Sequence, residues 1–292
     1  MTELRETAKS SVVSTFAMVL CVFVWPSLAT GQDNIATLKL TKSCVDCDFV
    51  GQSFPFSDFS DTEMRCVNFS QANLQEAGFE NAEITGIFDE ANLRGAKFNG
   101  AKINEVRIDC QQRLGLEISN SAGRINQGFV RSDMRGADLS GVVYSNNIIF
   151  DGAKLDGSSL KSGRITGGAL YLRGASGRAA NFSSFNGRLH ISSSQFSNSN
   201  FSGILSPELI AEGSDFSGAD FSGARLERSR LVDGNFNGSN FRGSDLSNSD
   251  LSGSDFSGAD FTGANLQGVR FEGTKLCEAI GPDGTMLFIN CD

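Results

Sequence analysis

The chain contains 292 residues, of which 25 are lysine or arginine and 34 are aspartate or glutamate, so its formal net charge is −9. An acidic chain without a lysine or arginine cluster offers little to the phosphates of DNA or RNA, and we expect no nucleic-acid partner. The single histidine, His190, excludes a metal site built from several histidines, and a Ser-His-Asp site would depend on this one residue.

The N-terminus is typical of a secretory signal peptide. Basic residues up to Lys9 precede an apolar run over residues 12–24, and a small-residue motif for a signal peptidase ends at Ala29. The apolar run is short for a membrane span. We therefore predict a signal peptide over residues 1–29 and export to the periplasm or the cell exterior. The alternative is an uncleaved membrane anchor formed by residues 12–29.

Large side chains recur at every fifth position over most of the remaining chain, most regularly over residues 216–276. Neither a helix nor a strand keeps every fifth side chain on one buried face, whereas a chain that turns a corner at each step does. The order of phenylalanine and leucine repeats every twenty residues, so four corners close one coil. The predicted core columns are Phe216, Phe236 and Phe256; Phe221, Phe241 and Phe261; Leu226, Leu246 and Leu266; and Leu231, Leu251 and Phe271.

The five-residue spacing also runs through the N-terminal half, which gives about 11–12 coils and a rod of about 50–55 Å at the spacing of adjacent strands. Three irregular stretches interrupt it, at residues 109–128, 171–190 and 206–213. In the last of these, Ser206 and Ala211 stand where phenylalanine or leucine belongs. Insertions in repeat proteins gather on a functional face, so we expect a binding face near these stretches. Tolerated loop variation is the alternative.

The repeating unit, Ala-Asp-Phe-Ser-Gly at residues 219–223, resembles the pentapeptide-repeat family. The resemblance implies an all-β fold, a right-handed quadrilateral parallel β-helix with four repeats per coil. The segment T-K-S-C-V-D-C-D-F resembles the N-terminal cap of exported members, and the tail C-x3-GPDG-T-x5-C resembles their C-terminal ending. We therefore expect an N-terminal cap over residues 30–48, the β-helix over residues 49–276 and a C-terminal cap over residues 277–292.

The resemblance also implies disulfides between Cys44 and Cys47 and between Cys277 and Cys291, one at each end of the rod. The second would close a loop of about 15 residues, which the chain-entropy estimate values at about 3 kcal/mol. A redox or metal site is the alternative for Cys44 and Cys47. Zinc would need two further ligands, and only Cys66 is a candidate. Cys66 and Cys110 have no evident partner.

The remaining polar residues do not form a recognisable catalytic set. The abundant aspartates precede the central Phe or Leu of each unit, so a solvated face explains them better than an acid–base pair. His190 is best explained as an incidental polar residue. We expect no enzymatic activity, no cofactor and no metal.

The predicted function is a non-enzymatic exported scaffold, a rigid polar rod that binds a protein, glycan or envelope partner and could pair end to end as a homodimer. Some pentapeptide-repeat proteins mimic DNA and bind type II topoisomerases, which is the first alternative. Mixed charges within a column, such as Arg225 above Asp245, and a tail unlike the helical dimerisation segment of those proteins argue against it. A membrane-anchored envelope spacer is the second alternative.

Overall fold

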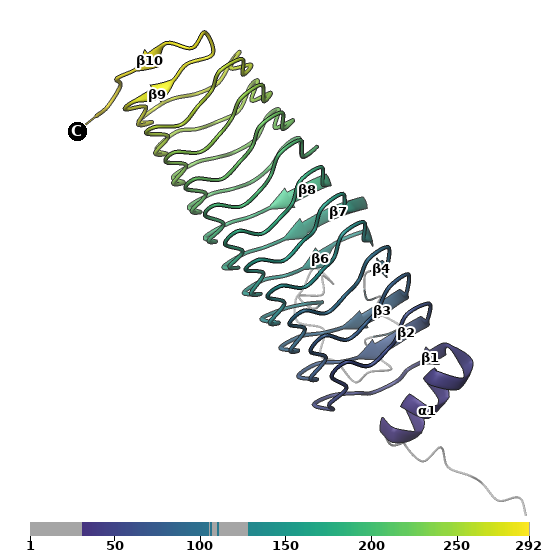
Figure 1. Ribbon diagram of the computed structural model, residues 1–292. Coiled ribbons are helices and arrows are strands. Elements are labelled where there is room, and N and C mark those ends of the chain that lie inside the picture. Colours follow the sequence, from purple (N-terminus) through teal and green to yellow (C-terminus); the bar gives the residue numbers. More distant parts are fainter. Residues whose placement is uncertain (1–30, 105, 107–109, 111–127, 292) are drawn as a thin grey trace, which may run out of the picture.

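The protein is a rod of stacked four-sided coils (Figure 1). The structure, a computed structural model, describes residues 31–104, 106, 110 and 128–291. Helix α1 (Gly31–Thr41) covers the N-terminal end, and an antiparallel pair, β9 (Ala279–Ile280) and β10 (Met286–Leu287), lies at the C-terminal end. The predicted signal peptide lies outside the described residues. Within the described part of the chain, no helix is long and apolar enough to cross a membrane.

Each coil has four faces, which we name A to D in chain order. Face A carries β1 (Ser43–Val45), β2 (Glu63–Asn68), β3 (Glu83–Ile87), β4 (Lys102–Asn104), β5 (Val143–Ser145), β7 (Arg164–Tyr171) and β8 (Asn186–His190), which pair in parallel in this order. Strands β7 and β8 continue around the corner onto face B, where β7 also pairs with β6 (Ile148–Ile149). The all-β parallel β-helix predicted from the sequence is confirmed.

Faces C and D are built from single bridging residues, because each straight segment is too short for a longer strand. On face C the residues that pair from coil to coil are Ser53, Asn73, Asn92, Asp133, Lys154, Ser176, Gln195, Asp215, Asn235, Asp255 and Lys275, which gives eleven levels. On face D the corresponding series begins at Asp58 and ends at Ile280. Every level is bonded only to the levels before and after it, as expected of a solenoid.

The corners depend on two features of the five-residue unit. The residue two positions after the central one has a left-handed backbone, as in Gly223 with φ 63° and Arg228 with φ 59°. The exposed Asp or Asn before the central residue accepts the N–H of the residue two positions on, as in Ser222 N–H to Asp220 Oδ1 at 2.9 Å. Asp and Asn side chains stabilise turns in this way, which explains why these residue types recur at that position.

The central side chains form the core. Ten of the twelve predicted column residues are fully buried, and the other two, Leu266 and Phe271 in the last coil, are partly exposed. Phenylalanine rings of neighbouring coils stack nearly parallel: the centroid of Phe241 lies 4.8 Å from that of Phe221 and 5.3 Å from that of Phe261. Buried serines fill many of the small positions, and several donate their hydroxyls to backbone carbonyls, as Ser249 Oγ does to Leu226 O at 2.9 Å; the Ser158 hydroxyl has no partner in the described structure.

The stretch 171–190, where the sequence predicts an irregular segment, continues the coil, and Leu172, Phe182 and Leu189 are fully buried. This coil is one residue shorter than the regular ones, because Tyr171 pairs with His190. A larger irregularity lies earlier, in β7, where the register shifts between Arg164 and Ala169. Gly168 permits the shift, since a Cβ there would lie 2.4 Å from the carbonyl carbon of Asn146. The sequence pattern did not locate the extra residues of β7, because the glycines and arginines of this region do not mark the position of a corner.

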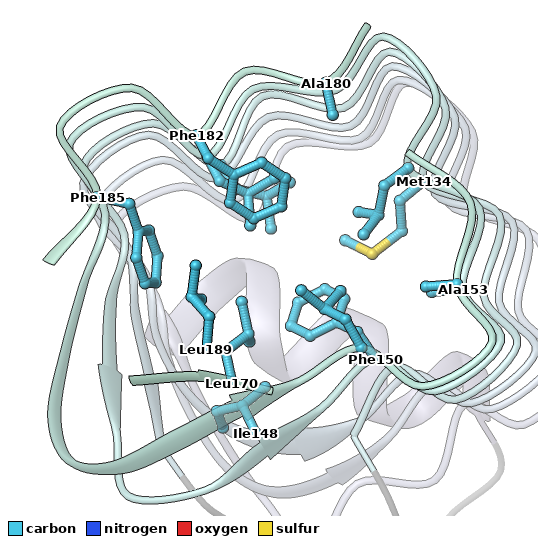
Figure 2. Packing of buried hydrophobic residues seen from close by; sticks show 14 of the residues in the cluster. Met134, Ile148, Phe150, Ala153, Leu170, Ala180, Phe182, Phe185 and Leu189 are labelled. Carbon is cyan, nitrogen blue, oxygen red and sulfur yellow. The ribbon is translucent and has the colours of Figure 1, made fainter. Parts of the chain in front are cut away.

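At residues 206–213 the coil also continues without interruption, and the core compensates for the missing bulk. Ser206 and Ala211 are buried at the central positions, while Ile204 and Leu209, at positions that normally hold small residues, are fully buried beside them. Large residues also occupy the small positions in the preceding coils, where Ile148, Leu170 and Leu189 line up on one side of the core (Figure 2). Total core volume, and not the size of each position, is what the fold requires.

The stretch 109–128 lies outside the described residues except for Cys110 and Gly128. The residues on either side of this stretch show where the insertion lies in the coil. Lys102 pairs directly with Val143 on face A, and the described chain resumes at Gly128 on face B. Asp89 Oδ1 accepts the N–H groups of Gly128 and Val130, both at 3.0 Å, and so holds the returning chain. Burial raises the pKa of Asp89 above its ordinary value despite these bonds.

Candidate interaction face

The six cysteines of the described residues form three disulfides. Two are the end pairs implied by the resemblance, Cys44–Cys47 and Cys277–Cys291, and the third joins Cys66 to Cys110. The sulfurs of Cys44, Cys47 and Cys66 are therefore not thiolates, and the zinc alternative loses its ligands. The described residues contain no group of His, Cys, Asp or Glu arranged to hold a metal ion.

Sequence reasoning left Cys66 and Cys110 unassigned, although they are the two that remain once the end pairs are assigned. Their disulfide ties the inserted segment to the outside of the second coil. Together with Ile87 and Val106 they form a small buried cluster that is separate from the main core. This part of the outer surface is therefore covered by the chain itself.

The outward residues of face B are less polar in the middle of the rod than in the first and last coils. Its outward positions hold Ile149, Tyr171, His190 and Ile210, which pair with one another in this order in consecutive coils. We call these four residues the face-B stripe. The equivalent positions of the next three coils hold Arg230, Asp250 and Arg270. Ile149 is nearly buried, and the other three are partly exposed. The Tyr171 and His190 rings lie 4.8 Å apart at a tilt of 56°.

Paired charges border the stripe. Arg173 contacts Asp151 through Nε at 2.8 Å and Nη2 at 2.5 Å, and Arg230 contacts Glu212 at 2.8 Å. On the adjoining part of face A, Arg188 lies 3.6 Å from Glu208. A partly exposed aromatic and aliphatic centre with arginines and carboxylates at its rim is the usual composition of a protein–protein interface.

The environment of His190 keeps its ring uncharged near neutral pH. Burial, with the nearby Arg188 and Arg173 guanidinium groups, lowers the pKa of His190 below its ordinary value. An uncharged imidazole stacked beside Tyr171 can be covered by a partner with less loss of hydration than a charged one. His190 is thus part of an apolar surface, where sequence analysis treated it as an incidental polar residue.

Residues from all three predicted irregular stretches meet on face B. Gly128 pairs with Ile149, Tyr171 and His190 bound the second stretch, and Ile210 belongs to the third. Sequence analysis did not identify Ile149 or this convergence. The spacings from Gly128 to Ile149, from Ile149 to Tyr171 and from Tyr171 to His190 all differ from twenty, so the alignment of these residues is not visible in the repeat.

Comparison with known proteins agrees with this architecture. The sequence model of the pentapeptide repeats, with 8 copies, matches residues 43–86, 212–248 and 239–276. Residues 43–86 and 212–276 of the chain therefore consist of pentapeptide repeats. The coils between the matched segments have the same four-sided pairing, although their sequences depart further from the repeat. No curated protein matches the chain.

Several solved structures are distantly similar to the chain. HetL, a pentapeptide-repeat protein involved in heterocyst differentiation regulation from the cyanobacterium Nostoc sp. strain PCC 7120, is 18% identical, with 88% of this chain and 98% of HetL covered and a TM-score of 0.43. QnrB1, a plasmid-mediated fluoroquinolone resistance protein, is 16% identical, with 76% of this chain and 90% of QnrB1 covered and a TM-score of 0.33. A pentapeptide-repeat protein of the Arabidopsis thaliana thylakoid lumen is 18% identical, with 47% and 69% covered and a TM-score of 0.18. At these values the likeness does not extend to function.

Proposed function

We propose that this pentapeptide-repeat protein is an exported, non-enzymatic scaffold that binds a protein partner through the face-B stripe. The observation that carries the proposal is that Ile149, Tyr171, His190 and Ile210 occupy outward positions of face B that hold Asp, Asn or Arg in the first and last coils. Tyr171, His190 and Ile210 are partly exposed at these positions, whereas Ile149 is buried. Partly exposed apolar side chains that are contiguous over several coils are typical of an interaction surface.

The paired charges around the face-B stripe favour a protein partner over a glycan or a nucleic acid. The arginines around the stripe are each opposed by a carboxylate, so they give no basic patch for phosphates. The partly exposed Tyr171 ring and Ile210 side chain favour a partner with an apolar surface of its own.

Export is supported by the signal-like residues 1–29 and by the three disulfides, which persist in oxidising compartments. N-terminal sequencing and thiol counting test this part of the proposal. Export requires a mature N-terminus near Thr30 and no free thiol at Cys277 or Cys291. Cytoplasmic protein with an intact Met1 and free thiols would overturn it and would make the topoisomerase hypothesis the next to test.

The DNA-mimic alternative requires a continuous acidic surface. In the regular coils the columns mix charges instead: Arg225 pairs with Asp245, and Arg230, Asp250 and Arg270 follow one another. Arg242 Nη1 contacts Asp260 on face D at 2.9 Å. Such pairs neutralise the carboxylates that a DNA mimic would present.

A site-specific crosslink tests the interaction face. A photo-reactive p-benzoylphenylalanine at Tyr171, in the full chain expressed in its natural host, is expected to give a discrete crosslinked protein. The same residue at Asn240, a partly exposed position on face D, is the control and is expected to give none. Ile210→Ser should weaken the Tyr171 crosslink. Equal products from both positions, or a product degraded by glycan hydrolases and resistant to proteases, would contradict a protein partner on face B.

A further inference from the structure

Positive charge is concentrated in the middle of a rod that is acidic elsewhere. Residues 157–207 contain no aspartate or glutamate, although the chain has 34 of them in all. The same residues include one lysine and four arginines: Lys161, Arg164, Arg173, Arg178 and Arg188. They belong to the coils that carry β7 and β8, in the middle of the rod (Figure 1). Carboxylates outnumber basic side chains on both sides of this region.

The uncompensated part of this charge gathers on face A and its two edges. Arg164 is exposed on face A, and Lys161 is exposed at the edge between faces D and A. In the described part of the chain, neither side chain forms an ion pair with a carboxylate. At the edge between faces A and B, Arg188 and Arg228 share a single carboxylate, Glu208, at 3.6 and 3.5 Å. Face A therefore carries an excess of positive charge in these coils.

The two other arginines of the region lie away from face A. Arg173 contacts Asp151 beside face B, so its charge is offset. Arg178 lies by itself at the edge between faces C and D, where it donates to Gln195 Oε1 at 3.0 Å. The opposite side of the rod thus has one isolated cation where face A has a group of them.

Leu205 adds an apolar contact to the same surface. Arg164, Asn186 and Leu205 pair with one another in this order along face A. Leu205 is 38% exposed, and among the described residues between Phe56 and Met286 no other large apolar side chain is as exposed. In the next coils Arg225 and Asp245 follow, and their opposite charges offset each other. We call Lys161, Arg164, Arg188 and Leu205 the face-A patch.

We propose that the protein bound at the face-B stripe also covers the face-A patch, and that the surface it places there is acidic around an apolar centre. This placement rests on the function proposed above and adds the chemistry of the partner. The two surfaces are continuous, because Leu205 and Ile210 lie in one coil on either side of a single corner. An acidic surface is attracted to the patch and repelled by the coils on either side, so charge complementarity positions the partner along the rod. Three cations are few for a nucleic acid, whose partners typically make about 6–10 phosphate contacts.

Peptide binding tests the charge of the partner without the partner itself. The probe is a fluorescein-labelled peptide of glutamates with one central leucine, titrated at low salt with the full chain, its disulfides intact, and followed by fluorescence anisotropy. Arg164→Glu should weaken binding about tenfold, because it removes an attraction and adds a repulsion. Arg178→Glu is the matched control, since it makes the same change of charge at the opposite edge, and should weaken binding less than about twofold. Leu205→Ser should weaken binding of this peptide about threefold, and should not affect a peptide with serine in place of the leucine.

Three results of the titration would overturn the proposal. The first is a wild type that does not bind the peptide. The second is an equal loss of affinity in Arg164→Glu and Arg178→Glu, which would indicate attraction to charge anywhere on the rod. The third is equally tight binding of a short single-stranded DNA with the same dependence on Arg164, which would indicate a general anion site.

Photo-crosslinking separates this proposal from the one on face B. p-Benzoylphenylalanine at Asn186, exposed on face A between Arg164 and Leu205, should trap the same protein as at Tyr171 in the natural host. Arg164→Glu should reduce the Asn186 product more than the Tyr171 product. A product at Tyr171 with none at Asn186 would overturn the extension onto face A and leave the face-B proposal intact. The absence of a product at both positions would contradict the face-B proposal, and the extension with it.

Discussion

The stacked phenylalanines of the regular coils provide the most direct test of the core assignment. Phe241 is fully buried, and its ring contacts those of Phe221, Phe261, Phe236 and Phe256 at centroid distances of 4.8, 5.3, 6.0 and 5.6 Å. Truncation to alanine leaves a cavity that is bounded by the coils above and below. Each of these coils is fixed by its own backbone hydrogen bonds and cannot collapse into the space. We therefore expect Phe241→Ala to destabilise the protein by about 3–5 kcal/mol.

The assay is equilibrium unfolding in guanidinium chloride under oxidising conditions, followed by far-ultraviolet circular dichroism. Phe56→Gly is the matched control, because it removes the same side chain type from an exposed corner with φ 56°. Glycine relieves the strain there, and we expect it to leave stability unchanged or raise it by about 0.5–1 kcal/mol. A loss below about 2 kcal/mol for Phe241→Ala would refute the rigid-coil argument, since it would mean that neighbouring coils can move to fill the cavity.

Three further substitutions test individual polar groups. The Tyr144 hydroxyl is buried without a hydrogen-bond partner in the described structure, and burial raises its pKa, so Tyr144→Phe should increase the free energy of unfolding by about 1 kcal/mol in the same denaturation assay. Asp89→Ala leaves two N–H groups at the return of the inserted segment without an acceptor, and should cost about 2 kcal/mol and speed amide exchange at Gly128 and Val130. The Ser247 N–H holds the pKa of Asp245 below its ordinary value, so the charged form is favoured by folding. The resulting stability is present above about pH 4 and lost as the pH falls through the folded pKa. Asp245→Asn, which retains the acceptor, should therefore show a smaller decrease in melting temperature between pH 5 and pH 2 than the wild type.

The five-residue and twenty-residue periods were sufficient to predict the architecture because they are direct consequences of the fold. A corner every five residues places one large side chain inward, and parallel stacking places each over the residue one coil away. The columns at Phe216 and Phe221 could therefore be assigned before any coordinates were known. The assignment of core residues failed where a small residue occupies a central position and a large residue occupies a small position. Ser206 and Leu209 are examples, and neither follows the rule for its position.

The interaction face could be predicted only as a region. Its residues are separated by coils of unequal length, so Ile149, Tyr171 and Ile210 do not share a visible period. Their outward direction depends on the register shift in β7, which brings Leu170 inward and Tyr171 outward at a position the repeat does not define. The Cys66–Cys110 disulfide was likewise hidden, because it joins a regular coil to an insertion whose path is set by tertiary contacts.

The regular coils beyond the face-B stripe act, on this view, as a spacer between the stripe and the C-terminal end. Deletion of residues 236–255 tests this idea, since it removes one full coil and joins Asn235 to Phe256 in the original register. Phe256 would then lie over Phe216, and the rod should fold about 4.8 Å shorter and retain the Tyr171 crosslink.

Deletion of residues 236–245 is the matched control. It preserves the five-residue spacing but rotates the C-terminal coils by half a turn, so that Leu246 lies over Phe216 and Phe256 over Leu226. The aromatic stacks across this junction are lost, and the shorter deletion should be the less stable of the two despite removing fewer residues. Equal stability would show that five residues, and not twenty, are the independent unit. Loss of the Tyr171 crosslink in the full-coil deletion, with folding intact, would place part of the binding site in the regular coils and contradict their role as a spacer.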